Sequence, residues 1–284
     1  MTVLLRRKNL GRTSCRGISE KSQEGITTVR NDKPFPEGHD LVIRWGCTSN
    51  APVRNVLNTA KAIHEVADKV GFRMKLLPED LCPGTWRDPA EAREAVGDGV
   101  SLVFRPNTHS RGRHCYTSST LEDDARILEC VRRLQKGVYA QEEVQKSKEF
   151  RVFVVQGRAI AVVEKIPGNP NDLAWNVAQG AVFENVRWDN WPLRAVRVAL
   201  EAFSLSSLDF GGVDVMVDTQ GKPYVLEINS APSLTSEYRQ QCFAKAFDYI
   251  VRHGKERIPL IPERGGYLKF IHPAITERAQ LCAV

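Results

Sequence analysis

The sequence lacks long apolar runs, internal repeats and low-complexity tracts. No stretch approaches the roughly 18 consecutive apolar residues of a membrane-spanning helix. The first residues, MTVLLRRKNLGRTSCRG, hold only a short apolar run before their arginines, which is not the pattern of a secretory signal. These absences exclude a membrane-spanning protein and a repeat array, and we expect no membrane partner.

The cysteines also exclude several classes of protein. There are seven, an odd number, and none forms a C-x-x-C pair. This usage argues against a disulfide framework and against a zinc site, and it favours a reduced chain in the cytoplasm with its cysteines in apolar surroundings.

The chain has 284 residues, of which 42% are hydrophobic and 26% charged, which suits one large globular domain or two intertwined subdomains. Its net charge is +6, with much of the excess near the start. The early basic residues are Arg6, Arg7, Lys8, Arg12, Arg16, Lys21 and Arg30. They indicate either an arm for nucleic acid or another polyanion, or, more commonly, a solvated and partly mobile terminus. A polyanionic substrate such as ATP would also explain a basic surface.

The pattern predicts mixed helices and strands with antiparallel hairpins, and not a doubly wound parallel sheet. A turn-rich linker at 31–38 precedes the expected first strand, 39–46, and Gly71 is expected to end the first helix. We expect helices near 57–70, 120–136, 193–203 and 236–252, a strand at 99–106, a loop at 107–118 and hairpins around Gln156-Gly157 and within 213–229.

The second hairpin ends in an unusual polar face. Because side chains alternate along a strand, Glu227 and Asn229 share one face of YVLEIN. With a turn centred on Thr219-Gln220, Asp214 lies diagonal to Glu227, within roughly 7–8 Å. The opposite, core face would then carry Val213, Val215, Val217, Tyr224, Leu226 and Ile228. Two close carboxylates and an amide oxygen suit Mg²⁺, although a solvated face with scattered acids is the plainer alternative.

The segment DFGGVDVMVDTQGKPYVLEINSAPSL resembles the final signature of the ATP-grasp superfamily, and is most similar to its glutamate-ligase-like carboxylate–amine ligases. The resemblance implies an α+β fold in which two subdomains hold ATP between antiparallel sheets. It also implies that Asp214, Glu227 and Asn229 bind Mg²⁺, or Mn²⁺ in its place. The DFG at 209–211 does not indicate a protein kinase, because no G-x-G-x-x-G loop or H-R-D segment accompanies it.

The resemblance, which covers about residues 41–250, assigns further roles. Lys69 would be the first phosphate-binding lysine, and Arg105 stands where the family usually has the second. The loop after Arg105 would close over the phosphates with Ser110, Arg111, Gly112 and Arg113. Gln141, Glu142, Glu143 and Val144 would form the adenine hinge, with Glu142 or Glu143 on the ribose. Arg151, Lys165 and Asn176 would be the catalytic residues, facing the substrate or the transferred phosphoryl group.

The expected organisation has four parts. Residues 1–58 form a basic arm and a reduced N-terminal subdomain, 59–140 a small subdomain with the phosphate loop, 141–252 a large subdomain with the magnesium site, and 253–284 an extension. The resemblance implies a ligase that joins a carboxylate to an amine through an acyl phosphate, releasing ADP and phosphate. Two alternatives stay open: a phosphotransferase or weakened nucleotide-binding relative, and a nucleic-acid-binding protein with a vestigial nucleotide site.

Overall fold

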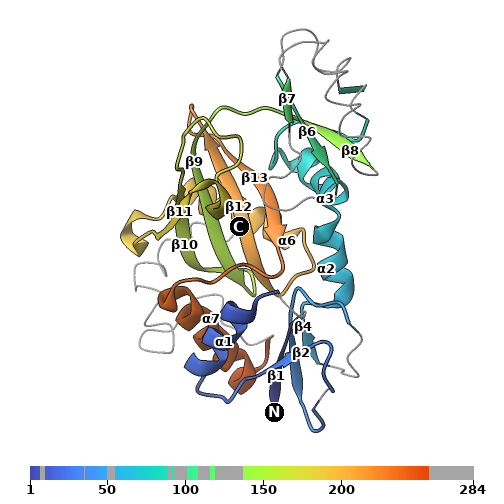
Figure 1. The fold of residues 1–284 in the computed structure, drawn as a ribbon, viewed down its shortest axis with the longest axis vertical. Helices are drawn as coiled ribbons and strands as arrows, with labels where there is room; N and C mark the ends of the chain where they lie inside the picture. Colours follow the sequence, from blue (N-terminus) through green and yellow to red (C-terminus); the bar gives the residue numbers. More distant parts are fainter. Residues whose placement is uncertain are drawn as a thin grey trace.

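A computed structural model describes residues 1–6, 10–34, 36–49, 55–88, 91–92, 101–107, 116–118 and 137–255. Three sheets organise the chain (Figure 1). The expected helix at 120–136 and most of the loop at 107–118 lie outside these ranges. No helix in the described ranges is long and apolar enough to cross a membrane.

The N-terminal sheet has the order β2-β1-β3-β4 and is parallel throughout. Its strands are β1 (Thr2–Arg6), β2 (Thr27–Arg30), β3 (Leu41–Trp45) and β4 (Val56–Leu57), and α1 (Arg12–Lys21) joins the first two. The expectation that 39–46 is the first strand is therefore wrong. The apolar residues after Met1 form β1, which is buried along its whole length between two neighbours.

The described basic residues of the N-terminal segment belong to these folded elements. Arg6 closes the buried strand β1, Arg16 pairs with Glu20 one turn along α1, and Arg30 pairs with Asp32 after β2. These residues therefore belong to folded elements that lie in or beside a sheet packed into the core. The Arg16 side chain is nevertheless exposed to solvent, as predicted, and the predicted mobility stays a prediction.

The central sheet is antiparallel, with the order β11-β10-β9-β12-β13. Its strands are β9 (Lys146–Val155), β10 (Arg158–Ile166), β11 (Val182–Asn185), β12 (Phe210–Asp218) and β13 (Pro223–Asn229). The hairpin at Gln156-Gly157 is confirmed. Both turn residues have positive φ, 49° and 71°, which is the geometry of a two-residue turn that matches strand twist.

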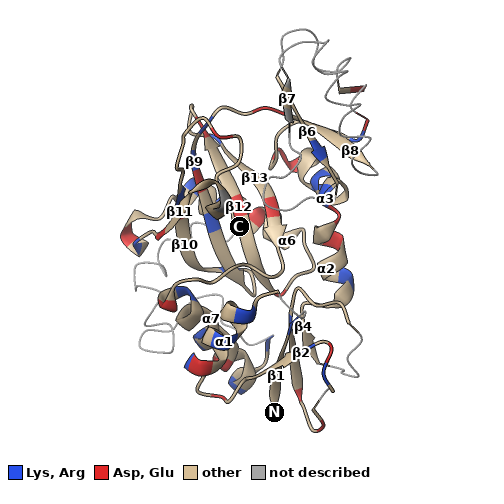
Figure 2. Cartoon of the chain, viewed as in Figure 1, with Lys and Arg blue, Asp and Glu red and all other residues tan. Residues whose placement is uncertain are grey.

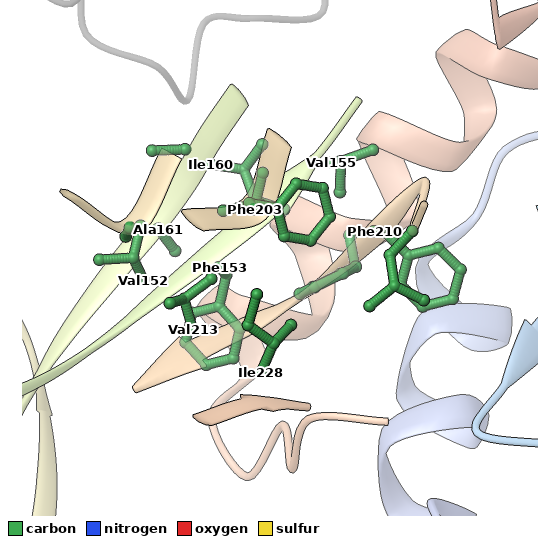
Figure 3. Packing of buried hydrophobic residues seen from close by; sticks show 14 of the residues in the cluster. Val152, Phe153, Val155, Ile160, Ala161, Phe203, Phe210, Val213 and Ile228 are labelled. Carbon is green, nitrogen blue, oxygen red and sulfur yellow. The ribbon is translucent and has the colours of Figure 1, made fainter. Parts of the chain in front are cut away.

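Helices α6 (Leu193–Ser204) and α7 (Glu237–His253) confirm two of the predicted helices. They carry apolar side chains into one continuous core (Figure 3), in which Phe203 of α6 lies near the strand residues Val155 and Ile160. An aromatic cluster ties the N-terminal sheet to this core. The ring of Trp45 stacks on Phe210 with centroids 5.3 Å apart and meets the edge of Phe243 at 5.4 Å.

The small sheet has the order β5-β8-β6-β7. It consists of β5 (Thr85–Trp86), β6 (Leu102–Pro106), β7 (Tyr116–Ser118) and β8 (Val138–Glu142). Helices α2 (Ala60–Ala67) and α3 (Lys69–Leu76) run along one side of the molecule from the N-terminal sheet to the small sheet (Figure 1). Three 3-10 turns complete the described elements: η1 (Leu77–Glu79), η2 (Val177–Gln179) and η3 (Trp188–Asn190).

The expected single helix over 57–70 is two helices, and Gly71 does not end it. The break falls at Asp68, which closes α2 and whose side chain accepts a hydrogen bond from the Gly71 N–H inside α3. An aspartate in this position satisfies a free N–H of the following helix, so a new helix begins where glycine alone suggested a stop.

Candidate functional site

A cleft of about 1000 Å³ lies between the central sheet and the small sheet. Its floor is one face of the central sheet, and its other walls come from α2, from the small sheet and from residues 170–176 and 230–233. The small-sheet residues that face it, Val103, Arg105 and Gln141, share one side of paired strands. The opposite side of that sheet packs Phe104 and Ala140 into a separate apolar cluster.

Arg151, Asp214 and Glu227 form one row across three adjacent strands. Asp214 pairs directly with Glu227 on β13 and with Arg151 on β9. The row is therefore tighter than expected, because the two carboxylates are directly opposite rather than diagonal. Asn229 continues the same face and donates from Nδ2 to Glu227 Oε1 at 3.0 Å.

Two local features correct the predicted register. The turn spans Asp218–Lys222, since Asp218 Oδ1 accepts the N–H groups of Gln220 and Lys222, each at 2.8 Å. Val217 consequently pairs with Pro223, not Lys222. A bulge between the Asp214 and Val215 pairs then moves Glu227 opposite Asp214. Pro223 and Val225 replace Tyr224 and Leu226 on the core face that also holds Val213, Val215 and Ile228.

Asp214 is the centre of a buried ion network. Its Oδ1 accepts from Arg151 Nε at 2.5 Å, and its Oδ2 from Arg151 Nη2 and Lys165 Nζ, both at 2.8 Å. Lys165 also contacts Glu149, which binds Lys146 Nζ at 2.9 Å. Basic and acidic segments accordingly lie on neighbouring strands of this sheet (Figure 2).

The network fixes the charge of its members. Burial alone would raise the pKa of Asp214, but Arg151 and Lys165 outweigh it and hold that pKa below its usual value. Burial likewise opposes ionisation of Glu227, whose pKa is nevertheless lowered by Lys69, to which it is paired. Burial lowers the pKa of Lys146 despite the attraction of Glu149. Asp214 and Glu227 are thus both ionised at neutral pH.

Gly212 makes room for the Arg151 side chain. A Cβ atom on Gly212 would lie 2.9 Å from the Pro232 side chain and 3.3 Å from Arg151 Cδ. A larger residue at this position would push the guanidinium away from Asp214. Glycine is therefore required on sterics, and not for an unusual φ.

The donor set fits magnesium. Asp214, Glu227 and Asn229 present two ionised carboxylates and an amide on one face, which are the hard oxygen ligands that Mg²⁺ prefers. No group of three His, Cys, Asp or Glu side chains within the described ranges could hold a metal. A metal here would complete its shell with the amide and with oxygens from a phosphate or water.

Most of the predicted site residues that the structure describes meet in this cleft. Those that line it are Lys69, Arg105, Gln141, Glu143, Val144, Arg151, Lys165, Asn176, Asp214, Glu227 and Asn229. Glu142 does not; it is exposed at the end of β8, whereas Glu143 lines the cleft and accepts from Ser101 Oγ. Ser110, Arg111, Gly112 and Arg113 lie outside the described residues.

Two predicted residues have particular surroundings. Asn176 caps η2, because its Oδ1 accepts from Gln179 N at 3.2 Å and its Nδ2 donates to Gln179 Oε1 at 2.8 Å. Gln141 lines the cleft and is buried, and its Oε1 has no hydrogen-bond partner among the described residues.

Sequence reasoning missed Lys146 and Trp175. Lys146 Nζ donates to the Leu173 carbonyl at 3.1 Å and lies 4.3 Å from the centre of the Trp175 ring. A bulge at Ser147 places Lys146 on the same side as Glu149, although simple alternation puts residues 146 and 149 on opposite faces. No composition signal marks this bulge.

Comparison with known families and solved structures identifies this arrangement of sheets around a cleft as an ATP-grasp fold. A family model described as "RimK-like ATP-grasp domain" matches residues 102–247, just over half of the chain. The chain belongs to the RimK-like ATP-grasp family, as the resemblance of residues 209–234 implied.

Individual relatives agree with this assignment. The chain is 32% identical over 100 residues to a D-alanine–D-alanine ligase of Anaeromyxobacter dehalogenans (strain 2CP-C), a match that spans about a third of each protein. D-alanine–D-alanine ligase from Bacillus anthracis, complexed with ATP, superimposes with a TM-score of 0.65 over 91% of this chain and 97% of that one, at 14% identity.

The ATP-grasp ligase PsnB, complexed with a phosphomimetic variant of its minimal precursor, Mg and ADP, gives a TM-score of 0.61 over 88% and 98% of the two chains, also at 14% identity. These structural likenesses show the fold. The comparisons lend no support to the nucleic-acid interpretation of the N-terminal segment.

Proposed function

We propose that this protein is an ATP- and magnesium-dependent ligase that joins a carboxylate to an amine. The observation that carries the proposal is a cleft in which five cations lie among five carboxylates, with Asp214 and Glu227 directly opposite each other and beside the Asn229 amide. The cations are Lys69, Arg105, Lys146, Arg151 and Lys165. Such a site suits a substrate with several negative charges that must be positioned and neutralised during phosphoryl transfer.

The reaction has two steps, phosphoryl transfer to the carboxylate and then attack by the amine. A carboxylate oxygen attacks the γ-phosphorus of ATP, the bond from that phosphorus to the β–γ bridging oxygen breaks, and ADP leaves. The amine nitrogen then attacks the acyl carbon, the carbon–oxygen bond breaks, and inorganic phosphate leaves with the electron pair. The surplus proton of the amine passes to solvent. The product is an amide.

Different residues of the cleft have different roles in this reaction. Lys69 and Arg105 neutralise the phosphates, and Arg151 and Lys165 orient the substrate carboxylate or the transferred group. Asp214, Glu227 and Asn229 would hold Mg²⁺, which supplies further neutralisation of phosphate charge when bound. Lys69 is paired with Glu227, and Lys165 with Asp214. On binding of ATP and Mg²⁺, the lysines would pair with phosphate or substrate oxygens and the carboxylates with the metal, all within the same cleft.

For the substrates, we propose an amino acid or a peptide as the carboxylate. Support comes from the relatives, which include a D-alanine–D-alanine ligase and, among the structures of the ligase PsnB, one complexed with a precursor peptide. The amine partner is of the same broad class in this proposal.

Calorimetry tests the nucleotide site. We expect magnesium-dependent ATP binding by the wild type and its loss in a variant with Glu227→Ala and Asn229→Ala. Glu201→Ala, in an exposed ion pair on α6, is the matched control and should bind normally. A folded wild type that does not bind ATP would refute the proposal.

A second assay separates a ligase from a phosphotransferase. Position 105 is an arginine where the family usually has lysine, and this difference is the reason to test the phosphotransferase alternative. With candidate carboxylates, ADP release by a ligase increases when an amine is added and yields an amide. Release that ignores the amine and leaves a stable phosphorylated product would favour phosphotransfer.

A further inference from the structure

Asn107 connects the two phosphate-facing cations of the cleft. It follows Arg105 by two residues, at the end of β6, and its side chain reaches the start of α3. Its Oδ1 accepts from the Val70 N–H at 3.1 Å, and its Nδ2 donates to Asp68 Oδ1 at 3.0 Å. The two contacts fall on either side of Lys69.

The contacts act at a break between helices. Asp68 separates α2 from α3, so Lys69 is the first residue of a helix whose start is not fixed by a continuous helix before it. Arg73 also joins α3 to the small sheet: its Nη1 donates to Thr85 Oγ1 at 3.3 Å, and its guanidinium lies 6.0 Å from the centre of the Tyr139 ring. Asn107 is itself held to the start of β8, where its N–H donates to the Gly137 carbonyl at 3.2 Å.

We infer that Asn107 is a positioning residue that sets the spacing between Lys69 and Arg105 for a polyphosphate. This inference rests on the proposed function. Two cations that are already held at a fixed separation lose little conformational entropy when they bind phosphate. A loosely held pair must first be ordered, and the entropy lost in ordering it weakens binding. In this role Asn107 affects phosphate binding through the positions of Lys69 and Arg105 and does not contact the phosphates itself.

The test compares ligands with and without phosphate. Calorimetry with Mg²⁺ measures the binding of ATP and of adenosine to the wild type and to Asn107→Ala. We expect ATP affinity to fall about tenfold, the effect of about 1.4 kcal/mol, with adenosine affinity unchanged. The control is Asn31→Ala, which removes a comparable exposed hydrogen bond to Ser49 away from the cleft and should alter neither ligand.

A double-mutant cycle tests whether Asn107 works through Lys69. If it does, Asn107→Ala should weaken ATP binding less in a Lys69→Ala background than in the wild type. Equal losses for ATP and adenosine, unchanged ATP affinity, or full additivity would overturn the inference while the proposed function stands. A folded wild type that binds no ATP would overturn both.

Discussion

Asp214 is the residue on which the charges of the cleft converge. Its carboxylate is buried, yet it accepts three hydrogen bonds, two from the partly buried Arg151 and one from the buried Lys165. Each charge is tolerable only because the others are present, since an isolated ion in such surroundings carries a large desolvation cost. The same carboxylate is the proposed metal ligand, so stability and ligand binding depend on one side chain.

We therefore expect Asp214→Asn to lower the free energy of unfolding by about 3–5 kcal/mol, because Arg151 loses the carboxylate that it pairs with and the buried Lys165 loses one of its two. Urea denaturation measures this. Asp189→Asn, in an exposed pair with Arg187, is the control and should change stability by under about 1 kcal/mol. A variant as stable as the wild type would show that Arg151 and Lys165 find other partners.

The same residue gives a pH dependence. The pKa of Asp214 is lowered from its ordinary 3.8 in the folded protein. Its stabilisation is therefore complete above pH 3.8 and is lost as the pH falls through the lower, folded pKa. The wild type should lose stability on acidification below that point, and Asp214→Asn should lose less over the same range. Parallel acid curves for the two proteins would contradict this.

At the scale of elements, Asn58 joins the N-terminal sheet to the central sheet. It follows β4, is fully buried and has a positive φ of 59°. Its Oδ1 accepts from the N–H groups of Asp209 and Phe210 at 2.8 and 3.1 Å, and its Nδ2 donates to the Phe210 carbonyl at 2.9 Å. Its own N–H donates to Asp209 Oδ2 at 2.7 Å. The first residues of β12 are thereby fixed against the chain that enters α2.

We expect Asn58→Ala to destabilise the protein by about 3 kcal/mol or more, because it leaves several buried polar groups of the 209–210 segment without partners. Asn58→Gly distinguishes two causes. Glycine accepts the positive φ but makes none of the side-chain bonds. If chemical denaturation shows Gly to be nearly as harmful as Ala, the hydrogen bonds dominate; if Gly restores stability, the backbone conformation does.

For the whole molecule, the cleft is bridged by links between strand β13 of the central sheet and the segment that contains α3 and Leu81. Across it, Lys69 pairs with Glu227, and Arg73 Nη2 donates to the Leu226 carbonyl at 3.3 Å. Behind α3, the Val225 N–H donates to the Leu81 carbonyl at 2.7 Å. A ligand that contacts both sides of the cleft therefore binds only the assembled fold and should stabilise it as a unit.

We expect Mg²⁺ and ATP together, at about one hundred times the dissociation constant, to stabilise the wild type by about 2.7 kcal/mol. Thermal unfolding should show this as a raised Tm. The rise should disappear in Glu227→Ala and persist in Glu201→Ala. A rise of equal size in Glu227→Ala would place the nucleotide somewhere other than beside this carboxylate.

The sequence by itself determined several local elements and the types of side chain that line the candidate site. Alternation along 213–229 and the polar residues Asp214, Glu227 and Asn229 were sufficient to predict a hairpin with one polar face, which the structure shows. That this face binds Mg²⁺ stays a prediction. The turn pair Gln156-Gly157 likewise predicted the other hairpin, which the structure confirms. These features depend on residues close together in the chain, and their periodicity and backbone preferences can be recognised in the sequence.

Only the tertiary structure decided the register and the distant contacts. The bulges that set Glu227 opposite Asp214 and turn Lys146 toward Glu149 add single residues that composition does not mark. β1 escaped prediction because a short strand buried on both faces has no alternation, and its parallel partners lie elsewhere in the chain. The pairing of Lys69 with Glu227, 158 residues apart, exists only because packing brings α3 onto the edge of the central sheet.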